Sequence, residues 1–134
     1  MHDARADVTV LIIEDDRDVA EMYSFRLIAD GYVVKHARDG REGLRVATEE
    51  IPDCIYLDLR LPGLDGFEVL DGLRRCDATR DIPVIILSNV GDPELRDRGL
   101  NSGALGFLLK AETTPDQLSS AVWRSTRADV QVMR

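Results

Sequence analysis

The chain has 134 residues, of which 44% are apolar and 31% are charged. This length and composition predict one domain with its own hydrophobic core, and they argue against a multi-domain enzyme. Acidic residues outnumber basic ones by 25 to 17, a net charge of −8, so we do not expect nucleic acid or an anionic membrane as a direct partner.

The cysteines and histidines do not have the spacing of a zinc site. Cys54 and Cys76 are the two cysteines, and His2 and His36 are the two histidines. We expect free thiols in a reducing compartment. The first residues lack the apolar core of a signal peptide, and no apolar run approaches the roughly 18 residues of a membrane span. The sequence therefore predicts a cytoplasmic protein.

Expected strands and helices alternate along the chain. Five short runs rich in β-branched and apolar residues predict strands at 8–13, 32–36, 54–57, 84–87 and 107–109. Between them lie helix signals: an apolar stripe of Val19, Tyr23 and Leu27 ended by Gly31, an Asp39-Gly40 start, a stripe of Phe67, Leu70 and Leu73, an Asp92-Pro93-Glu94 start, and a capping box from Thr114 to Gln117. The order is (βα)5.

The first, third and fourth of these strands are nearly continuous apolar runs, as in a parallel sheet covered on both faces. Right-handed connections then favour a flavodoxin-like α/β sandwich with strand order 2-1-3-4-5. In such a sheet ligands bind beyond the carboxyl ends of the strands, so the residues after each strand carry the chemistry.

Acidic residues follow the first and third strands. Glu14, Asp15 and Asp16 come after the first, and Asp58 comes after the third. Carboxylates held close together repel one another unless a cation joins them, and hard oxygen ligands suit Mg²⁺ or Mn²⁺. Asp16 has an alternative role as the cap of the next helix.

A hydroxyl and an ammonium group are expected beside Asp58. Ser88 follows the fourth strand and Lys110 follows the fifth. Singly, each is an ordinary surface residue. Together with a bound cation, they are the groups that stabilise a phosphoryl group in transfer.

The sequence resembles the receiver domain of two-component response regulators, the CheY-like superfamily, over almost its whole length. The matching segments are Val10 to Asp16, Ile55 to Gly66, Val84 to Ser88 and Gly103 to Lys110. The resemblance implies that Asp58 accepts a phosphoryl group from a histidine kinase or a histidine phosphotransfer protein. It also implies that Asp15 and Asp58 bind Mg²⁺ directly, that Glu14 acts through water, and that the backbone carbonyl of Arg60 completes the protein ligands.

The resemblance also implies a switch. Ser88 would move toward the phosphoryl group, and Phe107 would rotate inward and change the face formed by the fourth helix, fifth strand and fifth helix. That face would contact a downstream target, an output domain or a second copy of the chain. A receiver of this kind catalyses only its own phosphorylation and dephosphorylation. Because Phe107 lacks a phenol hydroxyl, it has the alternative of being a plain core residue.

Four positions depart from the family pattern. Asn89 stands where alanine or glycine is usual and is expected to slow small-molecule phosphodonors. Arg60 and Val90 flank the path of the water that attacks the acyl phosphate, so the dephosphorylation rate should be peculiar to this protein. Ala111 replaces the common proline, which leaves open whether the Lys110–Ala111 bond is cis.

Other functions fit less well. An Asp-nucleophile phosphohydrolase needs a second aspartate where Arg60 stands, and Glu14, Asp15 and Asp16 would repel the phosphate of a flavin. A receiver that is never phosphorylated fits poorly with Asp58, Ser88 and Lys110 all present, whereas a phosphate relay or sink without output stays open. We expect an N-terminal extension at 1–7, the receiver domain at 8–127 and a C-terminal tail at 128–134. These bounds leave no room for a DNA-binding output domain, so we expect either a stand-alone receiver or the receiver of a longer regulator.

Overall fold

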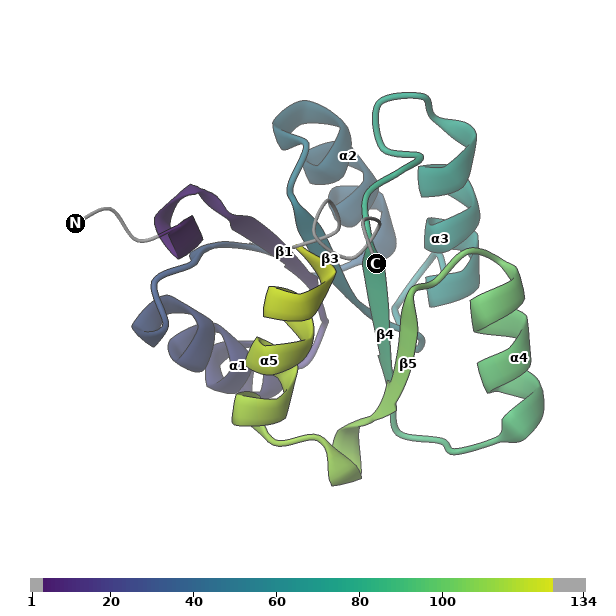
Figure 1. Cartoon of the computed structure of the whole chain (residues 1–134). Helices are drawn as coiled ribbons and strands as arrows, with labels where there is room; N and C mark the ends of the chain where they lie inside the picture. The colour runs from purple at the N-terminus through teal and green to yellow at the C-terminus, as the bar shows by residue number, and fades with distance from the viewer. Residues whose placement is uncertain (1–3, 127–134) are drawn as a thin grey trace, which may run out of the picture.

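The chain folds around one parallel sheet, seen in the computed structural model of Figure 1, in which residues 4–126 are described. Its strands are β1 (Thr9–Ile13), β2 (Val33–Ala37), β3 (Cys54–Asp58), β4 (Val84–Ser88) and β5 (Gly106–Leu109). All neighbouring pairs are parallel, in the order β2-β1-β3-β4-β5. The predicted topology is confirmed.

Five helices cover the two faces of the sheet. They are α1 (Arg17–Ala29), α2 (Gly40–Glu50), α3 (Gly66–Arg75), α4 (Pro93–Asn101) and α5 (Pro115–Ser125), with 3-10 turns η1 (Ala4–Asp7) and η2 (Lys110–Glu112). Helices α1 and α5 lie on one side, and α2, α3 and α4 lie on the other (Figure 1). Each side has its own apolar core, as a sheet covered on both faces requires.

The helix starts follow the capping signals in the sequence. Asp39 caps α2, Asp92 caps α4 with Pro93 in its first turn, and Thr114 and Gln117 form the capping box of α5. Gly31 follows α1 with a φ of 103°, a left-handed conformation that glycine adopts without strain. A second capping box, between Asp65 and Glu68, starts α3 and was not singled out from the sequence.

The strand boundaries differ from the prediction by about one residue. β1 begins at Thr9, β2 at Val33 and β5 at Gly106. β3 and β4 each extend one residue further than expected, because Asp58 pairs with Leu87 and Ser88 pairs with Leu109. Asp58 and Ser88 are therefore the last residues of their strands rather than the residues that follow them, which fixes their backbones within the sheet.

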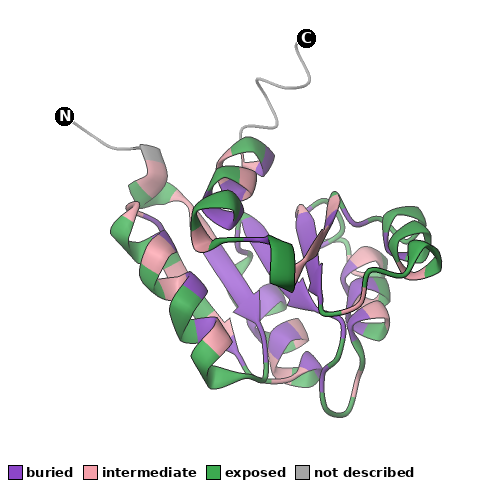
Figure 2. Cartoon of the chain, turned by 90° about the horizontal axis from the view of Figure 1, so that it is seen from below, coloured by how far each residue is buried: buried purple, intermediate pink, exposed green. Residues whose placement is uncertain are grey.

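Burial is greatest in the middle of the sheet, where Figure 2 shows the strands largely buried and the outer helix faces exposed. Every residue of β3 and β4 is buried, whereas the edge strand β2 alternates between exposed and half-buried positions before Ala37. The carboxyl ends of the central strands thus emerge from a fully packed core, which holds their side chains in fixed positions.

The two ends of the chain are described in part. Residues 4–7 of the expected N-terminal extension form η1, and the Arg5 guanidinium lies 4.8 Å from the ring centroid of Trp123 on α5. The first three residues and the expected tail at 128–134 lie outside the described residues. Within 4–126, no helix has the length and apolarity needed to cross a membrane.

Candidate functional site

Three carboxylates converge at the carboxyl edge of the sheet. One oxygen each from Glu14, Asp15 and Asp58 lies within 4.8 Å of the others. The cause is the register of the parallel strands β1 and β3, in which Ile13 is opposite Leu57. The residues that follow them, Glu14 and Asp58, therefore emerge at the same level. Glu14 and Asp58 are buried, and Asp15 is exposed.

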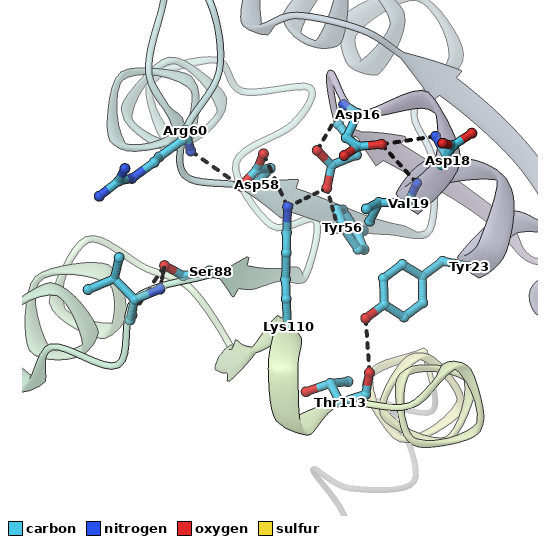
Figure 3. Close-up of polar contacts among 12 residues, drawn as sticks. Asp16, Asp18, Val19, Tyr23, Tyr56, Asp58, Arg60, Ser88, Lys110 and Thr113 are labelled. Carbon is cyan, nitrogen blue, oxygen red and sulfur yellow. Dashed lines mark hydrogen bonds and ion pairs between the residues drawn. The ribbon is translucent and has the colours of Figure 1, made fainter.

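Lys110 places its ammonium group between two of these carboxylates. Its Nζ lies 2.6 Å from Oε1 of Glu14 and 3.4 Å from Oδ2 of Asp58. The side chain reaches from η2 toward Asp58, as Figure 3 shows, and only 11% of it is exposed. The shorter distance shows that Lys110 pairs more closely with Glu14 than with Asp58.

Burial and mutual repulsion control the charges of this cluster. Burial and the charge of Glu14 raise the pKa of Asp58 to about 7. Burial also tends to raise the pKa of Glu14, but the hydrogen bonds from Lys110 and Tyr56 outweigh it and lower that pKa below its usual range. The single positive charge of Lys110 therefore stabilises the negative charge of Glu14 but does not offset the cost of a second negative charge on Asp58.

The carboxylate cluster suits a hard divalent cation. Three oxygens within 4.8 Å, one from an exposed residue and two from buried ones, match the ligand type and the open coordination positions of Mg²⁺ or Mn²⁺. Asp16 is used otherwise: its Oδ1 accepts hydrogen bonds from the backbone N–H groups of Asp18 and Val19. The capping interpretation of Asp16 is confirmed.

Arg60 contacts Asp58 through its backbone. The Arg60 N–H donates to Oδ1 of Asp58 over 3.3 Å, whereas the guanidinium points away from Asp58 (Figure 3). This bond orients the carboxylate, with Oδ1 toward the loop after β3 and Oδ2 toward Lys110.

Ser88 lies at the same edge but is turned to its own loop. Its hydroxyl donates to the Val90 carbonyl over 3.2 Å and accepts from the Val90 N–H over 3.1 Å. Ser88 shares with Asp15 and Arg60 the lining of an open groove of about 660 Å³. The hydroxyl therefore belongs to a residue that lines this groove, and it is bound within the β4–α4 loop.

Phe107 is buried beneath α4. Only 5% of it is exposed, and a Cβ added to Gly99 of α4 would lie 3.3 Å from the ring atom Cδ2. Its backbone carbonyl accepts a hydrogen bond from Arg96 of α4. The ring therefore lies inward in a structure in which the Ser88 hydroxyl is bound to Val90.

A family model described as the response regulator receiver domain matches residues 10–122. The chain belongs to this family. The finding agrees with the interpretation preferred from the sequence over a phosphohydrolase or a flavin carrier.

Curated relatives of this receiver are longer proteins. The DNA-binding dual master transcriptional regulator RpaA of Synechocystis is 40% identical over 110 residues, which cover 82% of this chain and 46% of RpaA. The transcriptional regulatory protein PrrA of Mycobacterium tuberculosis is 43% identical over 101 residues, covering 75% of this chain and 42% of PrrA. The chain thus spans less than half the length of either relative.

Solved structures of receivers superpose closely on this one. The Francisella response regulator 1452 receiver domain gives a TM-score of 0.85 at 30% identity, covering 92% of this chain and 99% of that one. The chemotaxis response regulator CheY4 of Vibrio cholerae gives 0.82 at 31% identity, covering 88% and 98%.

The receiver's site contains a residue that sequence reasoning missed. The Tyr56 hydroxyl donates to Oε1 of Glu14 over 2.7 Å. Burial raises the pKa of Tyr56, so its phenol stays protonated and remains a donor. The signal available in the sequence was a polar hydroxyl inside an apolar strand. Tyr56 comes two residues before Asp58, so the two side chains lie on the same face of the sheet.

Tyr56 is itself held by a second tyrosine of the receiver. The ring centroids of Tyr23 and Tyr56 are 5.5 Å apart with an interplanar angle of 52°, and the Tyr23 hydroxyl donates to the Thr113 carbonyl over 2.9 Å.

The sequence left open whether the Lys110–Ala111 peptide bond is cis. It is trans, since residues 4–126 contain no cis peptide bond.

Proposed function

We propose that this receiver is a phosphorylation-activated switch in which Asp58 accepts a phosphoryl group from a histidine kinase or a histidine phosphotransfer protein. The observation that carries the proposal is the grouping of Asp58 with Glu14, Asp15 and the Lys110 ammonium at one edge of the sheet. A carboxylate flanked by metal-type ligands and an ammonium is suited to phosphoryl transfer, in which positioning and charge stabilisation do most of the work.

The carboxylate cluster would hold the Mg²⁺ ion that this chemistry requires. We assign Asp15, Asp58 and the backbone carbonyl of Arg60 as direct ligands, and Glu14 as a ligand through water. When bound, Mg²⁺ would supply positive charge for the phosphoryl oxygens. The support is the fit of three carboxylate oxygens within 4.8 Å to an oxygen-liganded dication.

In the transfer step a carboxylate oxygen of Asp58 attacks the phosphorus of the donor. A P–O bond to Asp58 forms as the P–N bond to the donor's histidine breaks, and the imidazole leaves with the electron pair. The Arg60 N–H holds Oδ1 in place. Lys110 is 3.4 Å from Oδ2 and stabilises negative charge on the incoming group.

The acyl phosphate then draws neighbouring donors toward it. It brings a charge of about −1.5 to −2 into the site, which attracts the Lys110 ammonium and the Ser88 hydroxyl. Ser88 gives up its bonds to Val90 in the loop that leads to α4. The move is possible because the hydroxyl exchanges two bonds to one residue for a bond to a charged oxygen.

We assign α4, β5 and α5 as the output face, which contacts a downstream target, an output domain or a second copy of the chain. Two observations support a link from the site to this face. Ser88 is joined to α4 through the 88–90 loop, and Lys110 continues β5 toward α5. Phe107 and Gly99 pack where α4 meets β5, so a shift of the loop changes that packing.

The acceptor is tested by treating the protein with acetyl phosphate and Mg²⁺ and measuring intact mass. We expect one hydroxylamine-labile phosphoryl group, which is absent in Asp58→Asn. Asp16→Asn is the matched control, because asparagine also caps helices and the residue is bound to Asp18 and Val19. Label that persists in Asp58→Asn would place the acceptor elsewhere.

A phosphate relay or sink without output is the second candidate, because Phe107 already lies inward. Amide exchange with and without beryllofluoride and Mg²⁺ separates the two, with beryllofluoride standing in for the phosphoryl group on Asp58. A switch changes exchange in α4 (Pro93–Asn101) and at Phe107. Changes confined to the residues around Asp58 would favour the relay.

A further inference from the structure

Glu14 has more donors on one oxygen than on the other. Oε1 accepts from the Tyr56 hydroxyl over 2.7 Å and from Lys110 over 2.6 Å. Oε2 accepts from the Asp16 N–H over 3.2 Å. Since a carboxylate oxygen has two lone-pair positions, Oε1 is fully used by the protein and Oε2 keeps one position open.

One of the two donors on Oε1 is shared with the reaction. Lys110 also lies 3.4 Å from Asp58, and in the proposed function it moves toward the phosphoryl group. That movement removes a charged donor from Glu14, which has no exposed surface. A buried carboxylate that loses its counter-charge is strongly destabilised unless another donor remains.

Tyr56 is built to remain in place. It lies in β3, whose five residues are all buried, and its ring packs on Tyr23. Tyr23 is in turn fixed by its hydrogen bond to the Thr113 carbonyl. The Tyr56 hydroxyl therefore comes from the rigid centre of the sheet, whereas the Lys110 ammonium comes from a long side chain after the last strand.

We infer that Tyr56 is a positioning residue that holds Glu14 in its orientation and keeps the charge of Glu14 stabilised when Lys110 leaves for the phosphoryl group. The residue acts through Glu14 and makes no contact with the reacting atoms. The part of this inference that concerns the movement of Lys110 rests on the proposed function.

The contact is tested without metal by a double-mutant cycle. Tyr56→Phe, Lys110→Ala and the double variant are unfolded by urea in EDTA. Each single variant leaves one donor on Oε1, and the double leaves none. We expect the double variant to raise the unfolding equilibrium constant at least tenfold beyond the product of the two single effects. A double variant whose unfolding equilibrium constant lies within twofold of that product would overturn the inference, because a tyrosine that only fills space has an effect independent of Lys110.

Tyr32→Phe is the matched control for this cycle. Tyr32 is also a buried tyrosine, but it precedes β2 at the opposite edge of the sheet. Combined with Lys110→Ala, it should give independent effects. The same excess for Tyr32 and Tyr56 would overturn the inference, since it would then reflect general destabilisation.

A ligand measurement covers the case in which the double variant does not fold. In Tyr56→Phe we expect Mg²⁺ affinity within about twofold of the wild type, because Lys110 still pairs with Glu14 in that state. Beryllofluoride affinity in the presence of Mg²⁺ should fall about tenfold, because Lys110 is then drawn away. Unchanged beryllofluoride affinity would overturn the inference. A wild-type protein that is never phosphorylated would instead refute the proposed function, and the cycle in EDTA would still decide whether Tyr56 holds Glu14.

Discussion

Lys110 is the residue on which the charge balance of the site depends. Its ammonium is the cation that the structure places against both Glu14 and Asp58, with distances of 2.6 and 3.4 Å. Glu14 is fully buried, and only 11% of the Lys110 side chain is exposed. Ion pairs this deep differ from surface pairs, because removing one partner leaves the other charged and poorly solvated.

We therefore expect Lys110→Ala to lower the free energy of unfolding by about 3 kcal/mol in metal-free buffer. Millimolar Mg²⁺ should restore part of this loss, since it replaces the missing positive charge. Lys35→Ala is the control: Lys35 is 3.7 Å from Glu50 in an exposed pair, and its removal should change stability by less than about 1 kcal/mol. Equal losses in urea unfolding would contradict the prediction.

The two cysteines should differ sharply in reactivity. Cys54 has no exposed surface, its Sγ lies 3.4 Å from the Ser125 hydroxyl, and burial raises its pKa to about 11. Cys76 caps the end of α3 and is half-buried. Because the thiolate is the reactive form, the native protein at pH 8 should react with Ellman's reagent at Cys76 alone. The unfolded protein should react at both cysteines.

Cys76→Ser provides the check on this assignment. The native variant should show no rapidly reacting thiol, and one thiol should appear on unfolding. Rapid reaction of the native variant would mean that Cys54 is accessible.

At the scale of elements, the loop after β3 is fixed by the close approach of α3. A Cβ added to Gly66, the first residue of α3, would lie 2.7 Å from the Asp58 carbonyl oxygen and 2.6 Å from Cα of Leu59. Both contacts are to backbone atoms, which cannot rotate away. The glycine in the motif that follows Asp58 is therefore required by packing, and we expect its replacement to move the loop that follows Asp58.

Gly66→Ala should lower the free energy of unfolding by about 2 kcal/mol and slow labelling by acetyl phosphate. Gly106→Ala in β5 is the control, because a Cβ added there would lie 4.0 Å from Cγ2 of Ile85, an ordinary van der Waals contact. Urea unfolding and intact mass measure both effects. An unperturbed Gly66→Ala protein would show that the loop adapts without loss.

Helix α1 presents three apolar side chains to solvent. Met22, Phe25 and Ile28 are 45%, 79% and 59% exposed, on a helix that begins just after the acidic residues. We expect these exposed apolar side chains to contact the phosphodonor protein. We expect Phe25→Ser to slow phosphotransfer from a phosphohistidine protein about tenfold and to leave acetyl phosphate labelling unchanged.

The control for Phe25→Ser is Leu105→Ser. Leu105 is 56% exposed and precedes β5, at the edge of the sheet away from Asp58. It should affect neither reaction. Equal slowing of both donors by Phe25→Ser would indicate damage to the site instead of a lost contact.

At the scale of the whole molecule, we expect Mg²⁺ to stabilise the fold, because the acidic surplus includes three carboxylates at one edge of the sheet. The net charge is −8, and Glu14, Asp15 and Asp58 repel one another at the sheet edge. A ligand that binds only the native state adds RT ln(1 + [L]/Kd), which is about 1.4 kcal/mol at ten times Kd. A thermal melt should therefore shift upward in millimolar Mg²⁺.

Asp15→Asn should abolish this shift, and Asp16→Asn should keep it, because Asp16 is engaged in capping α1. A wild-type melt that does not respond to Mg²⁺ would refute the metal site. Trp123 lies on α5, so its fluorescence should report Mg²⁺ binding poorly.

The sequence alone determined the order of elements, the topology and the caps of α2, α4 and α5, because these depend on local patterns. Apolar runs of three to six residues, Asp39, Asp92 and the Thr114 box each act within a few positions of the chain. The same patterns brought Glu14, Asp15, Asp58, Ser88 and Lys110 to one edge, since parallel strands end together.

The tertiary structure alone decided which of these groups bond to which. The Tyr56 bond to Glu14, the closer pairing of Lys110 with Glu14 than with Asp58 and the turn of Ser88 toward Val90 are contacts of 2.6 to 3.4 Å. The burial of the Phe107 ring is a fourth such feature. Strand order places such residues in the same region but leaves their rotamers open. Their partners are set by register, burial and the competition of several donors for one carboxylate, which are properties of the packed molecule.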